Sequence, residues 1–479
     1  MKRYAIVLAA GKGTRMHSDR PKVLHALLGK PMLAYVLTAL STLPWDDVFL
    51  VVGHGREAVQ AAFADAGTFI VQDPQRGTGD AVRLALEAAP ELEATFLVIY
   101  GDAPLIRAET VERLIRTHEA AGADATALTA TVDDPRGFGR VVRDAEGRFL
   151  RIVEEKDADS AERLIREINV GLYAFYGPHL AEALGAIRAD NAQGEYYLTD
   201  VLHHLLAAGR RVATARLDDP EEAAGINDRL QLAAAEQTLR RRILTAHMRQ
   251  GVTIEDPAST WIGPDVMIER DTVVRAGSRL FGETRIGRGC EIGPQADLAD
   301  AIVGDGVHVW YAVARGVRID DGATVGPFAH LRPGAAIGRG VRIGNFVEVK
   351  NSTIGEKAKV PHLSYVGDAI VGREVNVGCG TITVNYDGVK KHATIIGDGA
   401  FIGCNTNLVA PVTVGDGAYV AAGSTITDDV PGGALAVARA RQVNKERYVE
   451  RLMARFGRPS RDPDARPESG PKQDRRNGE

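Results

Sequence analysis

The first half of the chain alternates short hydrophobic runs with stretches whose hydrophobic residues recur three and four positions apart. The runs predict strands, because Gly, Asp or Pro bounds each of them. They lie at 4–10, 47–53, 68–73, 95–102 and 124–132. The stretches between them predict helices at 31–43, 56–66, 79–89 and 108–121. This alternation favours a Rossmann-like α/β domain: a parallel sheet covered by helices on both faces, with ligands bound beyond the carboxyl ends of the strands.

Residues 228–250 depart from this alternation and predict one long helix. Their apolar residues recur three and four positions apart, alanine and arginine fill the positions between, and Gly251 follows. We interpret this stretch as a helical linker that joins a domain of residues 1–227 to a second domain.

Aliphatic residues recur at a period of six through residues 251–438. This period fits neither a helix nor a simple hairpin sheet, but it is typical of a parallel β-helix whose coils have three flat faces and turn one aliphatic side chain per face inward. Glycine often follows the aliphatic residue, as in IGRGVRIGN, where tight corners need backbone angles that other residues resist. A loop-rich β-sandwich would have to match the period at every position by chance. The positions are Ile262, Ile268, Val274, Leu280, Ile286, Ile292, Leu298, Val313, Ile319, Val325, Leu331, Ile337, Ile343, Val349, Ile396, Ile402, Leu408, Val414, Val420 and Ile426.

Composition is consistent with two or three domains. The chain has 479 residues, of which 45% are hydrophobic, and a net charge of only −5. This balance gives no sign of a general nucleic-acid or membrane partner, so any phosphate site must be local. No hydrophobic run approaches the ~20 residues that a membrane helix requires. Three cysteines without a C-x-x-C pair predict a reducing, cytoplasmic location.

The C-terminal segment, residues 439–479, differs in composition from the rest. Beyond Phe456 it is rich in Pro, Gly and charged residues and has almost no apolar residue. Because such a segment cannot bury enough apolar surface to fold, we predict a disordered tail.

The first predicted strand runs into a glycine-rich loop, AAGKGTRM, that suits phosphate binding. A dinucleotide fingerprint would need a small residue where Met16 stands, and a Walker loop would need a Gly-Lys pair followed by Ser or Thr. The loop therefore belongs to another class. Backbone amides of Gly11–Arg15 can form an anion nest, and Arg15 and Lys22 add positive charge.

Motifs from both halves together carry a resemblance to a known family. They are LAAGKGTRM and PKVL near the start, and RPGAAIGRGVRIGNFVEVKNSTIG, HLSYVGDAIVG and TITVNYDG in the repeat region. The chain resembles, up to about residue 450, the bacterial bifunctional N-acetylglucosamine-1-phosphate uridyltransferase and glucosamine-1-phosphate N-acetyltransferase. The resemblance implies a left-handed β-helix, a homotrimer, Mg²⁺ as cofactor, and acetyl-CoA and UTP as cosubstrates. It also implies that the product, UDP-N-acetylglucosamine, feeds cell-wall peptidoglycan and lipopolysaccharide synthesis.

The resemblance assigns roles in nucleotidyl transfer to residues of the first domain. Asp102 and Asn227 match the magnesium ligands, and Arg15 and Lys22 match the catalytic cations that face the phosphates. Gln72, Gly77 and Thr78 match the segment that reads uracil. The whole predicted nucleotide and sugar set is Leu8, Ala9, Ala10, Gly11, Lys22, Gln72, Gly77, Thr78, Tyr100, Gly101, Asp102, Gly139, Glu154, Asn169 and Asn227.

The resemblance also assigns an acetyl-transfer site to the repeat region. Its general base would be His362, because an imidazole can take a proton from the substrate amine near neutral pH. His362 interrupts the period of six, so we expect it on a loop lifted out of the coils, with Glu348 orienting it. The predicted contacts to the sugar phosphate are Arg332, Lys350, Tyr365, Asn376 and Asn385, and those to acetyl-CoA are Cys379, Asn385, Tyr386, Cys404, Ala422 and Arg439.

Two of these positions depart from the family pattern. Cys404 stands where the family commonly has serine, and Cys379 where it often has alanine. Neither cysteine has a basic neighbour in the sequence, so neither is predicted to act as a nucleophile. We expect cysteine at these positions to shift acetyl-CoA affinity, and Cys404 to confer sensitivity to thiol reagents.

Two other functions compete with the bifunctional enzyme. One is a single-activity sugar-1-phosphate nucleotidyltransferase whose β-helix serves regulation or assembly. The other is a non-catalytic trimeric scaffold. HLSYVGD and VNYDG argue against the first, because a platform needs no histidine beside basic and amide side chains, and Asp102, Asn227 and the basic loop argue against the second.

Overall fold

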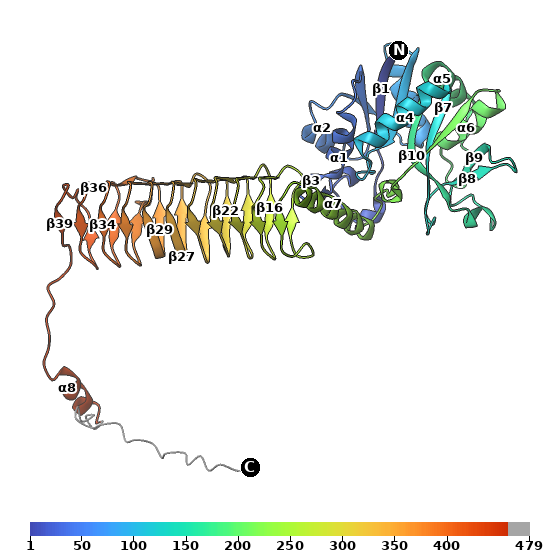
Figure 1. The fold of residues 1–479 in the computed structure, drawn as a ribbon. Helices are drawn as coiled ribbons and strands as arrows, with labels where there is room; N and C mark the ends of the chain where they lie inside the picture. The colour runs from blue at the N-terminus through green and yellow to red at the C-terminus, as the bar shows by residue number, and fades with distance from the viewer. Residues whose placement is uncertain (458–479) are drawn as a thin grey trace, which may run out of the picture.

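A nine-stranded sheet forms the centre of the N-terminal domain (Figure 1). The structure, a computed structural model, describes residues 1–457. Seven strands lie in the order β11 (Val212–Arg216), β7 (Ala125–Thr131), β10 (Glu167–Tyr176), β6 (Ala94–Tyr100), β1 (Lys2–Ala9), β4 (Asp47–Val52) and β5 (Thr68–Val71). β8 (Arg140–Arg143) and β9 (Phe149–Val153) form a hairpin attached to β10.

The sheet is mixed, whereas the sequence predicted a parallel one. β10 runs antiparallel to both of its neighbours, β6 and β7. The reason lies in the connection: the β8–β9 hairpin follows β7 without a crossover helix, so the chain re-enters the sheet in the opposite direction. The other neighbouring strands along the main path pair in parallel, as predicted.

Helices cover both faces of the sheet, which confirms that part of the prediction (Figure 1). α1 (Met32–Leu40), α2 (Arg56–Ala62) and α4 (Ala108–Ala121) contribute to one buried cluster. α3 (Thr78–Ala88), α5 (Gly177–Ala186) and α6 (Leu198–Ala207) contribute to the other. These two layers enclose the centres of β1 and β6, where Tyr4–Val7 and Ala94–Ile99 are all buried.

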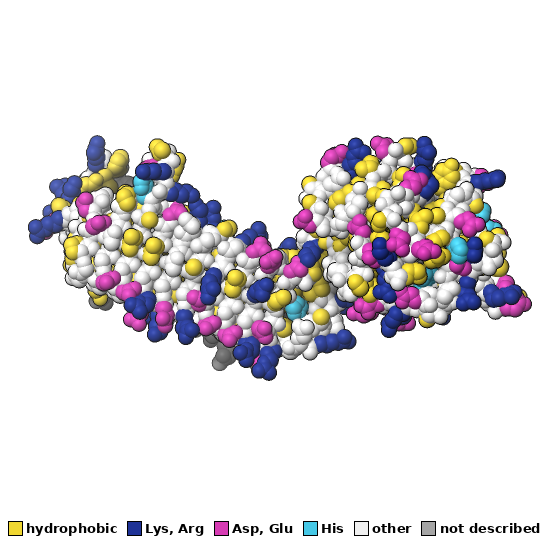
Figure 2. Space-filling view, turned by 90° about the horizontal axis from the view of Figure 1, so that it is seen from above, with side chains coloured by type: hydrophobic (Ala, Val, Ile, Leu, Met, Phe, Trp, Pro, Cys, Tyr) yellow, Lys and Arg dark blue, Asp and Glu magenta, His cyan; other side chains and the backbone are white. Residues whose placement is uncertain are grey.

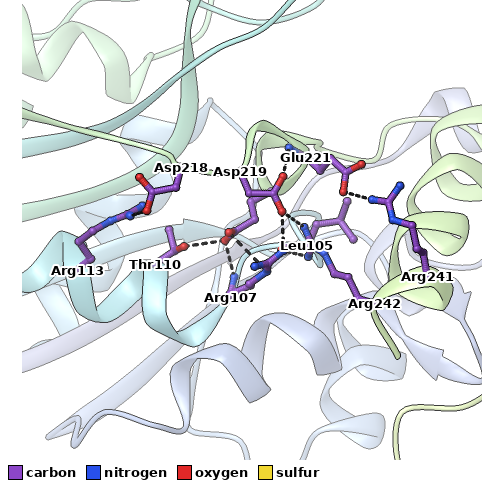
Figure 3. Close-up of polar contacts among 10 residues, drawn as sticks. Leu105, Arg107, Thr110, Arg113, Asp218, Asp219, Glu221, Arg241 and Arg242 are labelled. Carbon is purple, nitrogen blue, oxygen red and sulfur yellow. Dashed lines mark hydrogen bonds and ion pairs between the residues drawn. The ribbon is translucent and has the colours of Figure 1, made fainter. Parts of the chain in front are cut away.

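The linker helix α7 (Arg229–Arg249) lies between the two domains, as predicted (Figure 1). Asp228 begins it by accepting a hydrogen bond from the Gln231 amide at 2.9 Å. Figure 3 shows how charged side chains fasten it to the N-terminal domain. Arg242 of α7 donates to the Leu105 carbonyl at 2.8 Å and to Asp219 at 3.2 Å, and Arg107 reaches the same Asp219 oxygen at 2.5 Å. This network ties α7 to the start of α4 and to the short helix at Pro220–Ala223.

The C-terminal domain is a rod of short parallel strands, from β12 (Thr253–Ile254) to β39 (Leu435–Ala436) (Figure 1). They form a 19-stranded and a nine-stranded sheet, and their inward side chains make one continuous hydrophobic cluster. The period-six residues lie in this cluster with one exception, which confirms the predicted parallel β-helix.

Val313 is the exception and corrects the prediction. It lies partly exposed in β22 (Ala312–Arg315), while Ala312 and Ala314 on either side are buried. The inward residues Val309, Ala314 and Ile319 follow one another at five-residue intervals, because the corners here are one residue shorter. The period of six therefore resumes at Ile319, not at Val313.

The chain leaves the rod after β39 (Figure 1). α8 (Tyr448–Arg455) follows and has no buried residue. Most of the predicted disordered tail, residues 458–479, lies outside the described residues. Within residues 1–457, no helix combines the length and hydrophobicity needed to cross a membrane.

Two candidate active sites

The first candidate site is a cavity of about 510 Å³ where β1 and β6 end and α3 begins. Predicted residues from four separate segments line it together. They are Leu8, Ala10, Gly11, Lys22, Gln72, Gly77, Thr78, Tyr100 and Asp102. Ala9 and Gly101 lie next to these residues in the sequence. The Gly101 amide donates to the Leu8 carbonyl at 2.9 Å, which joins the ends of the two strands.

The glycine-rich loop folds back tightly over Lys22. Gly13 has a left-handed backbone with φ of 61°, and a Cβ there would lie 2.7 Å from Lys22 Cβ. Glycine at this position therefore allows the close approach of the two segments. Arg15 lies in the short helix at Thr14–Met16, where its side chain is exposed and does not line the cavity.

Lys22 connects the two predicted metal ligands. Its ammonium group donates to the Asp102 carboxylate and, at 3.3 Å, to the Asn227 side-chain oxygen. The Ile226 amide donates to the Asp102 carbonyl at 3.0 Å, which holds Asn227 beside Asp102 although 125 positions separate them in the sequence. One carboxylate and one amide oxygen thus converge on a single cation, and this donor set fits Mg²⁺, which takes few protein oxygens and completes its shell with water and phosphates. Within residues 1–457, no cluster of three or more His, Cys, Asp or Glu side chains could hold a metal ion.

The predicted uracil-reading segment is ordered by its own hydrogen bonds. The Gln72 amide group is buried and donates to the Gly77 carbonyl and to Asp80, both at 2.9 Å. Gly77 has φ of 113°, and a Cβ there would lie 2.6 Å from the Tyr196 carbonyl oxygen, so only glycine fits. Sequence reasoning missed Gln75, whose side chain lines the cavity and donates to the Ala10 carbonyl. Its only signal was its place in the same short loop as Gln72.

The predicted sugar contacts meet on the β8–β9–β10 side of the sheet. The Asn169 amide donates to the Gly139 carbonyl at 2.9 Å, and a Cβ on Gly139 would lie 3.5 Å from both Glu154 Oε1 and Asn169 Cβ. Asn169 also donates to the Tyr173 hydroxyl at 2.6 Å. These three residues therefore share one location. The Tyr100 ring lines the cavity and lies so close to Gly171 that a Cβ there would be 2.3 Å from it. Gly171 in turn donates to the Asn169 side chain, so Tyr100 lies between the cavity and the predicted sugar contacts.

Burial raises the pKa of Glu154, although the Thr199 hydroxyl donates to it at 3.2 Å and partly offsets the effect. A carboxyl group with a raised pKa binds more protons folded than unfolded, so folding stability falls as pH rises through the window above the ordinary Glu value of about 4.3. We expect Glu154→Gln, which removes this penalty, to raise the melting temperature at pH 8 by on the order of 2 °C, and the gain to vanish near pH 4. Calorimetry at both pH values measures this.

The exposed Glu93→Gln is the matched control for Glu154→Gln and should show no such pH-dependent gain. A Glu154→Gln gain of equal size at pH 4 and pH 8 would show that the effect comes from packing and not from ionisation.

The second candidate site lies on the surface of the rod, and its histidine is not on a loop. His362 belongs to the nine-residue strand β29 (Lys359–Gly367), which pairs in parallel with β27 (Arg342–Lys350). The expected loop is therefore wrong for His362, because a left-handed residue, Leu363, turns the corner without breaking the pairing. The segment that does leave the coils is 385–393, between β32 (Ile382–Val384) and β33 (Thr394–Ile396).

Asn345, not Glu348, contacts His362. The Nδ1 atom of His362 lies 2.7 Å from the side-chain oxygen of Asn345, its register partner on β27. Glu348 instead accepts a hydrogen bond from Arg332 at 2.8 Å. Since an amide oxygen only accepts, Nδ1 carries a proton, and in the neutral imidazole the lone pair is therefore on Nε2. The period of six did not indicate Asn345. Only the pairing of β27 with β29 brings it beside His362.

The predicted sugar-phosphate residues other than Asn376 lie close together on neighbouring coils. Tyr365 is the register partner of Glu348, and Asn385 donates to the Tyr365 hydroxyl at 3.4 Å. Asn385 also donates to Asp368 at 2.5 Å. Asn376 lies apart from this group, in register with Lys359 and Phe401.

Lys391 is a residue that sequence reasoning missed. It lies on segment 385–393 beside Lys350 and lowers the pKa of Lys350, chiefly through their close side-chain contact. Two adjacent ammonium groups favour an anion between them. Figure 2 shows further Lys and Arg side chains at the C-terminal end of the rod.

The predicted acetyl-CoA residues succeed one another along a corner of the rod. The Asn405 amide donates to the Cys379 carbonyl at 2.7 Å, and the Gly423 amide donates to the Cys404 carbonyl at 2.8 Å. A Cβ on Gly423 would lie 3.8 Å from Arg439 Cδ. Cys379, Cys404, Ala422 and Arg439 thus follow coil by coil. Tyr386 lies on segment 385–393 opposite Lys391. The backbone hydrogen bonds that close this turn come from the N–H groups of Asp387 and His392, so the turn does not use the N–H of Tyr386.

Comparison with known proteins gives matches along nearly the whole chain. The family models that match are the MobA-like NTP transferase domain over residues 5–211, the GMPPB C-terminal domain over 313–387 and the bacterial transferase hexapeptide (six repeats) over 393–428. The bifunctional protein GlmU of Brevibacillus brevis is 53% identical, over 94% of this chain and 97% of the relative. GlmU of Staphylococcus haemolyticus is 49% identical, over 94% of this chain and 100% of the relative. A solved putative glucose-1-phosphate thymidylyltransferase from Bacillus anthracis is 19% identical over 49% of this chain and 94% of its own, with a TM-score of 0.41.

Proposed function

The chain belongs to the family of bifunctional GlmU proteins, and from this premise we propose which residues carry each of its two reactions. The protein acetylates glucosamine 1-phosphate and then transfers UMP from UTP to N-acetylglucosamine 1-phosphate, which yields UDP-N-acetylglucosamine and releases pyrophosphate. The observation that carries the proposal is the convergence of Lys22, Asp102 and Asn227 at the edge of a cavity beyond the carboxyl ends of β1 and β6.

For uridyl transfer, we assign the phosphates of UTP to the glycine-rich loop and Lys22. A sugar-phosphate oxygen attacks the α-phosphate while pyrophosphate leaves, so the site must neutralise growing negative charge. Amides of residues 11–14, which line the cavity, and the Lys22 ammonium group supply positive charge along the cavity wall. Magnesium, held by Asp102 and Asn227, would neutralise phosphate oxygens. Lys22 would then exchange its contacts with these residues for contacts with phosphate.

The sugar belongs next to Gly139, Glu154 and Asn169, which share one location beside the cavity. Their amide and carboxyl groups suit the hydroxyl and acetamido groups of N-acetylglucosamine, because both kinds of group form directed hydrogen bonds. Gln72 and Gln75 also line the cavity and would hold the base.

For acetyl transfer, we assign the general base to His362. Its Nδ1 faces Asn345, so its Nε2 is the atom that accepts the proton of the substrate amine. Arg332, Lys350 and Lys391 supply positive charge for the sugar phosphate. The amine then attacks the thioester of acetyl-CoA, the N–H of Tyr386 stabilises the developing oxyanion, and the CoA thiolate leaves.

A homotrimer is the assembly we propose for this chain. Its support is an exposed column of apolar side chains along one corner of the rod, in which Tyr311 and Phe328 have ring centroids 5.5 Å apart and Phe328 and Phe346 stack at 5.6 Å. Leu363 continues this column and is 59% exposed. Four of the predicted acetyl-CoA residues are exposed, so a second copy could complete the site: Tyr386, Cys404, Ala422 and Arg439. A cytoplasmic location agrees with three cysteines that form no disulfide.

A product-resolved assay tests the bifunctional function against a nucleotidyltransferase with a passive β-helix. The purified chain receives glucosamine 1-phosphate, acetyl-CoA, UTP and Mg²⁺, and free CoA and pyrophosphate are measured separately. We expect both products, with pyrophosphate depending on prior acetylation. Release of pyrophosphate from supplied N-acetylglucosamine 1-phosphate without any release of CoA would overturn the acetyl-transfer half of the proposal.

A further inference from the structure

Cys379 and Cys404 lie opposite each other on adjacent coils of the rod. Before the corner, β31 (Asn376–Val377) pairs with β34 (Phe401–Ile402), and after it β32 pairs with β35 (Asn407–Val409). The register is the same on both sides of the corner, so it places Cys379 directly opposite Cys404. The hydrogen bond from the Asn405 amide to the Cys379 carbonyl, at 2.7 Å, holds the two corners together.

The two corners have the same local conformation. Each cysteine follows a glycine and precedes a residue with a left-handed backbone, Gly380 with φ of 77° and Asn405 with φ of 56°. A Cβ added to Gly380 would lie 2.2 Å from the Asn405 side-chain oxygen, so side chains at neighbouring corner positions touch. Equivalent turns project the side chains of Cys379 and Cys404 outward from the same corner.

The spacing of the coils suits a disulfide. Neighbouring strands lie about 4.8 Å apart, and a disulfide joins Cα atoms separated by about 4.4–6.8 Å. Both thiols are free, Cys404 is exposed and Cys379 is partly exposed, so small molecules can reach them. The third cysteine, Cys290, is 2% exposed in the rod interior and its thiol donates to the Gly304 carbonyl at 3.0 Å. Cys379 and Cys404 are therefore the one pair of cysteines that lie opposite each other and that solvent can reach.

The pair lies in the same corner column as His362. The constant register of β29 with β31 and β32 places His362 opposite Cys379 on the preceding coil, and the Gly380 amide donates to the Leu363 carbonyl at 2.8 Å. On the other side, Cys404 is followed coil by coil by Ala422. His362 on the adjacent coil is thus a basic neighbour of Cys379, although the two residues are 17 positions apart in the sequence.

We propose that Cys379 and Cys404 are an oxidation site at which a low-molecular-weight disulfide reversibly switches off acetyl transfer. This rests on the proposed function in one respect, the assignment of acetyl-CoA to this corner. A covalent bridge here would join two residues of the corner to which we assign acetyl-CoA, and it would lie one coil from the proposed base, His362.

The chemistry is thiol–disulfide exchange in two steps. The thiolate of Cys404, the more exposed residue, attacks one sulfur of the small disulfide, whose S–S bond breaks and releases one thiol. The thiolate of Cys379 then attacks the Cys404 sulfur, forms the Cys379–Cys404 bond and releases the second thiol. Two protein thiols are oxidised and one small disulfide is reduced to two thiols. An exposed disulfide of this kind is readily reduced again by excess thiol.

The test uses the full-length protein, first fully reduced and then incubated with oxidised glutathione or, in a second arm, with the disulfide of CoA. After removal of the oxidant, peptide mapping without reductant locates disulfides, and chromatography measures the formation of N-acetylglucosamine 1-phosphate. We expect a Cys379–Cys404 linked peptide, at least a tenfold loss of acetyl transfer that dithiothreitol restores, and uridyl transfer from supplied N-acetylglucosamine 1-phosphate within twofold of the reduced enzyme. A faster reaction with CoA disulfide would indicate entry through the acetyl-CoA site, and equal rates would indicate a general disulfide oxidant; both outcomes support the switch.

Three variants make the result specific. Cys404→Ser and Cys379→Ala should each lose the oxidant effect relative to their own reduced activity, while Cys290→Ala should keep it. Absence of the linked peptide, or a mixed disulfide on Cys404 that Cys379 never resolves, would overturn the proposal. So would a complete linkage that leaves acetyl transfer unchanged. The peptide map detects the disulfide whether or not the enzyme is active. If the reduced enzyme shows no acetyl transfer, that result refutes the proposed function and leaves the test of the disulfide unaffected.

Discussion

His362→Ala lowers acetyl transfer about 10³-fold, because a positioned general base contributes roughly 10²–10⁴ to the rate. The hydrogen bond between Asn345 and Nδ1 orients the His362 ring, so Nε2 is positioned before substrate binds. The measurement is the release of CoA from acetyl-CoA and glucosamine 1-phosphate. The effect should fall on kcat, with KM for glucosamine 1-phosphate nearly unchanged, because the phosphate is held by other residues.

The matched control is His308→Ala, another exposed histidine on a strand of the same rod, which pairs with Glu291 at 3.6 Å. It should keep wild-type rates of both reactions. Because His362→Ala makes no substrate for the second reaction, its pyrophosphate release must be tested with supplied N-acetylglucosamine 1-phosphate, where it should equal wild type. Acetyl transfer by His362→Ala within threefold of wild type would assign the base to another residue.

Asp102→Asn lowers uridyl transfer at least about 100-fold, which corresponds to roughly 2.8 kcal/mol of transition-state stabilisation. The substitution keeps the size of the side chain and can still accept a hydrogen bond from Lys22. It removes the one negative charge that, with the Asn227 oxygen, suits magnesium. The readout is pyrophosphate release from UTP and N-acetylglucosamine 1-phosphate as a function of Mg²⁺ concentration. The half-saturating Mg²⁺ concentration should rise along with the loss of rate.

Asp65→Asn, at an exposed carboxylate on the loop after α2, is the control for charge alone and should leave both rates unchanged. Asp102→Asn should also leave acetyl transfer within twofold of wild type, because the rod carries that site by itself. A loss of uridyl transfer with no change in the magnesium dependence would mean that Asp102 positions Lys22 and does not hold the metal.

Local patterns predicted the secondary structure well wherever neighbouring residues in the sequence determine whether a side chain is buried. The first five predicted strands and four predicted helices are all present, and the linker helix begins and ends within one residue of the prediction. The period of six predicted the inward residues because each coil repeats one local geometry. It failed at Val313, where corners one residue shorter moved the inward position to Ala314.

The direction of β10 and the place of His362 were not predictable in this way. Direction in a sheet depends on how the chain returns, and the β8–β9 hairpin that reverses it has no sequence signal distinct from any other hairpin. His362 interrupts the period as a loop residue would, yet the corner at Leu363 absorbs the irregularity and β29 stays paired. Periodicity reports spacing along the chain and not hydrogen bonding between coils.

By itself, the sequence determined the two-domain architecture, the family and the residue types available at each site, because hydrophobic period and motif spacing are properties of the chain alone. Only the tertiary structure decided which of those residues meet. Asn227 reaches Lys22 across the sheet edge, Asn345 and not Glu348 faces His362, Lys391 joins Lys350, and Cys404 comes to lie opposite Cys379. These pairs join separate segments of the chain, 17 residues apart for Asn345 and His362 and 205 for Lys22 and Asn227. The pairing of strands on adjacent coils and the return path of the chain bring them together, and the sequence around one residue does not show which residue of another segment it will face.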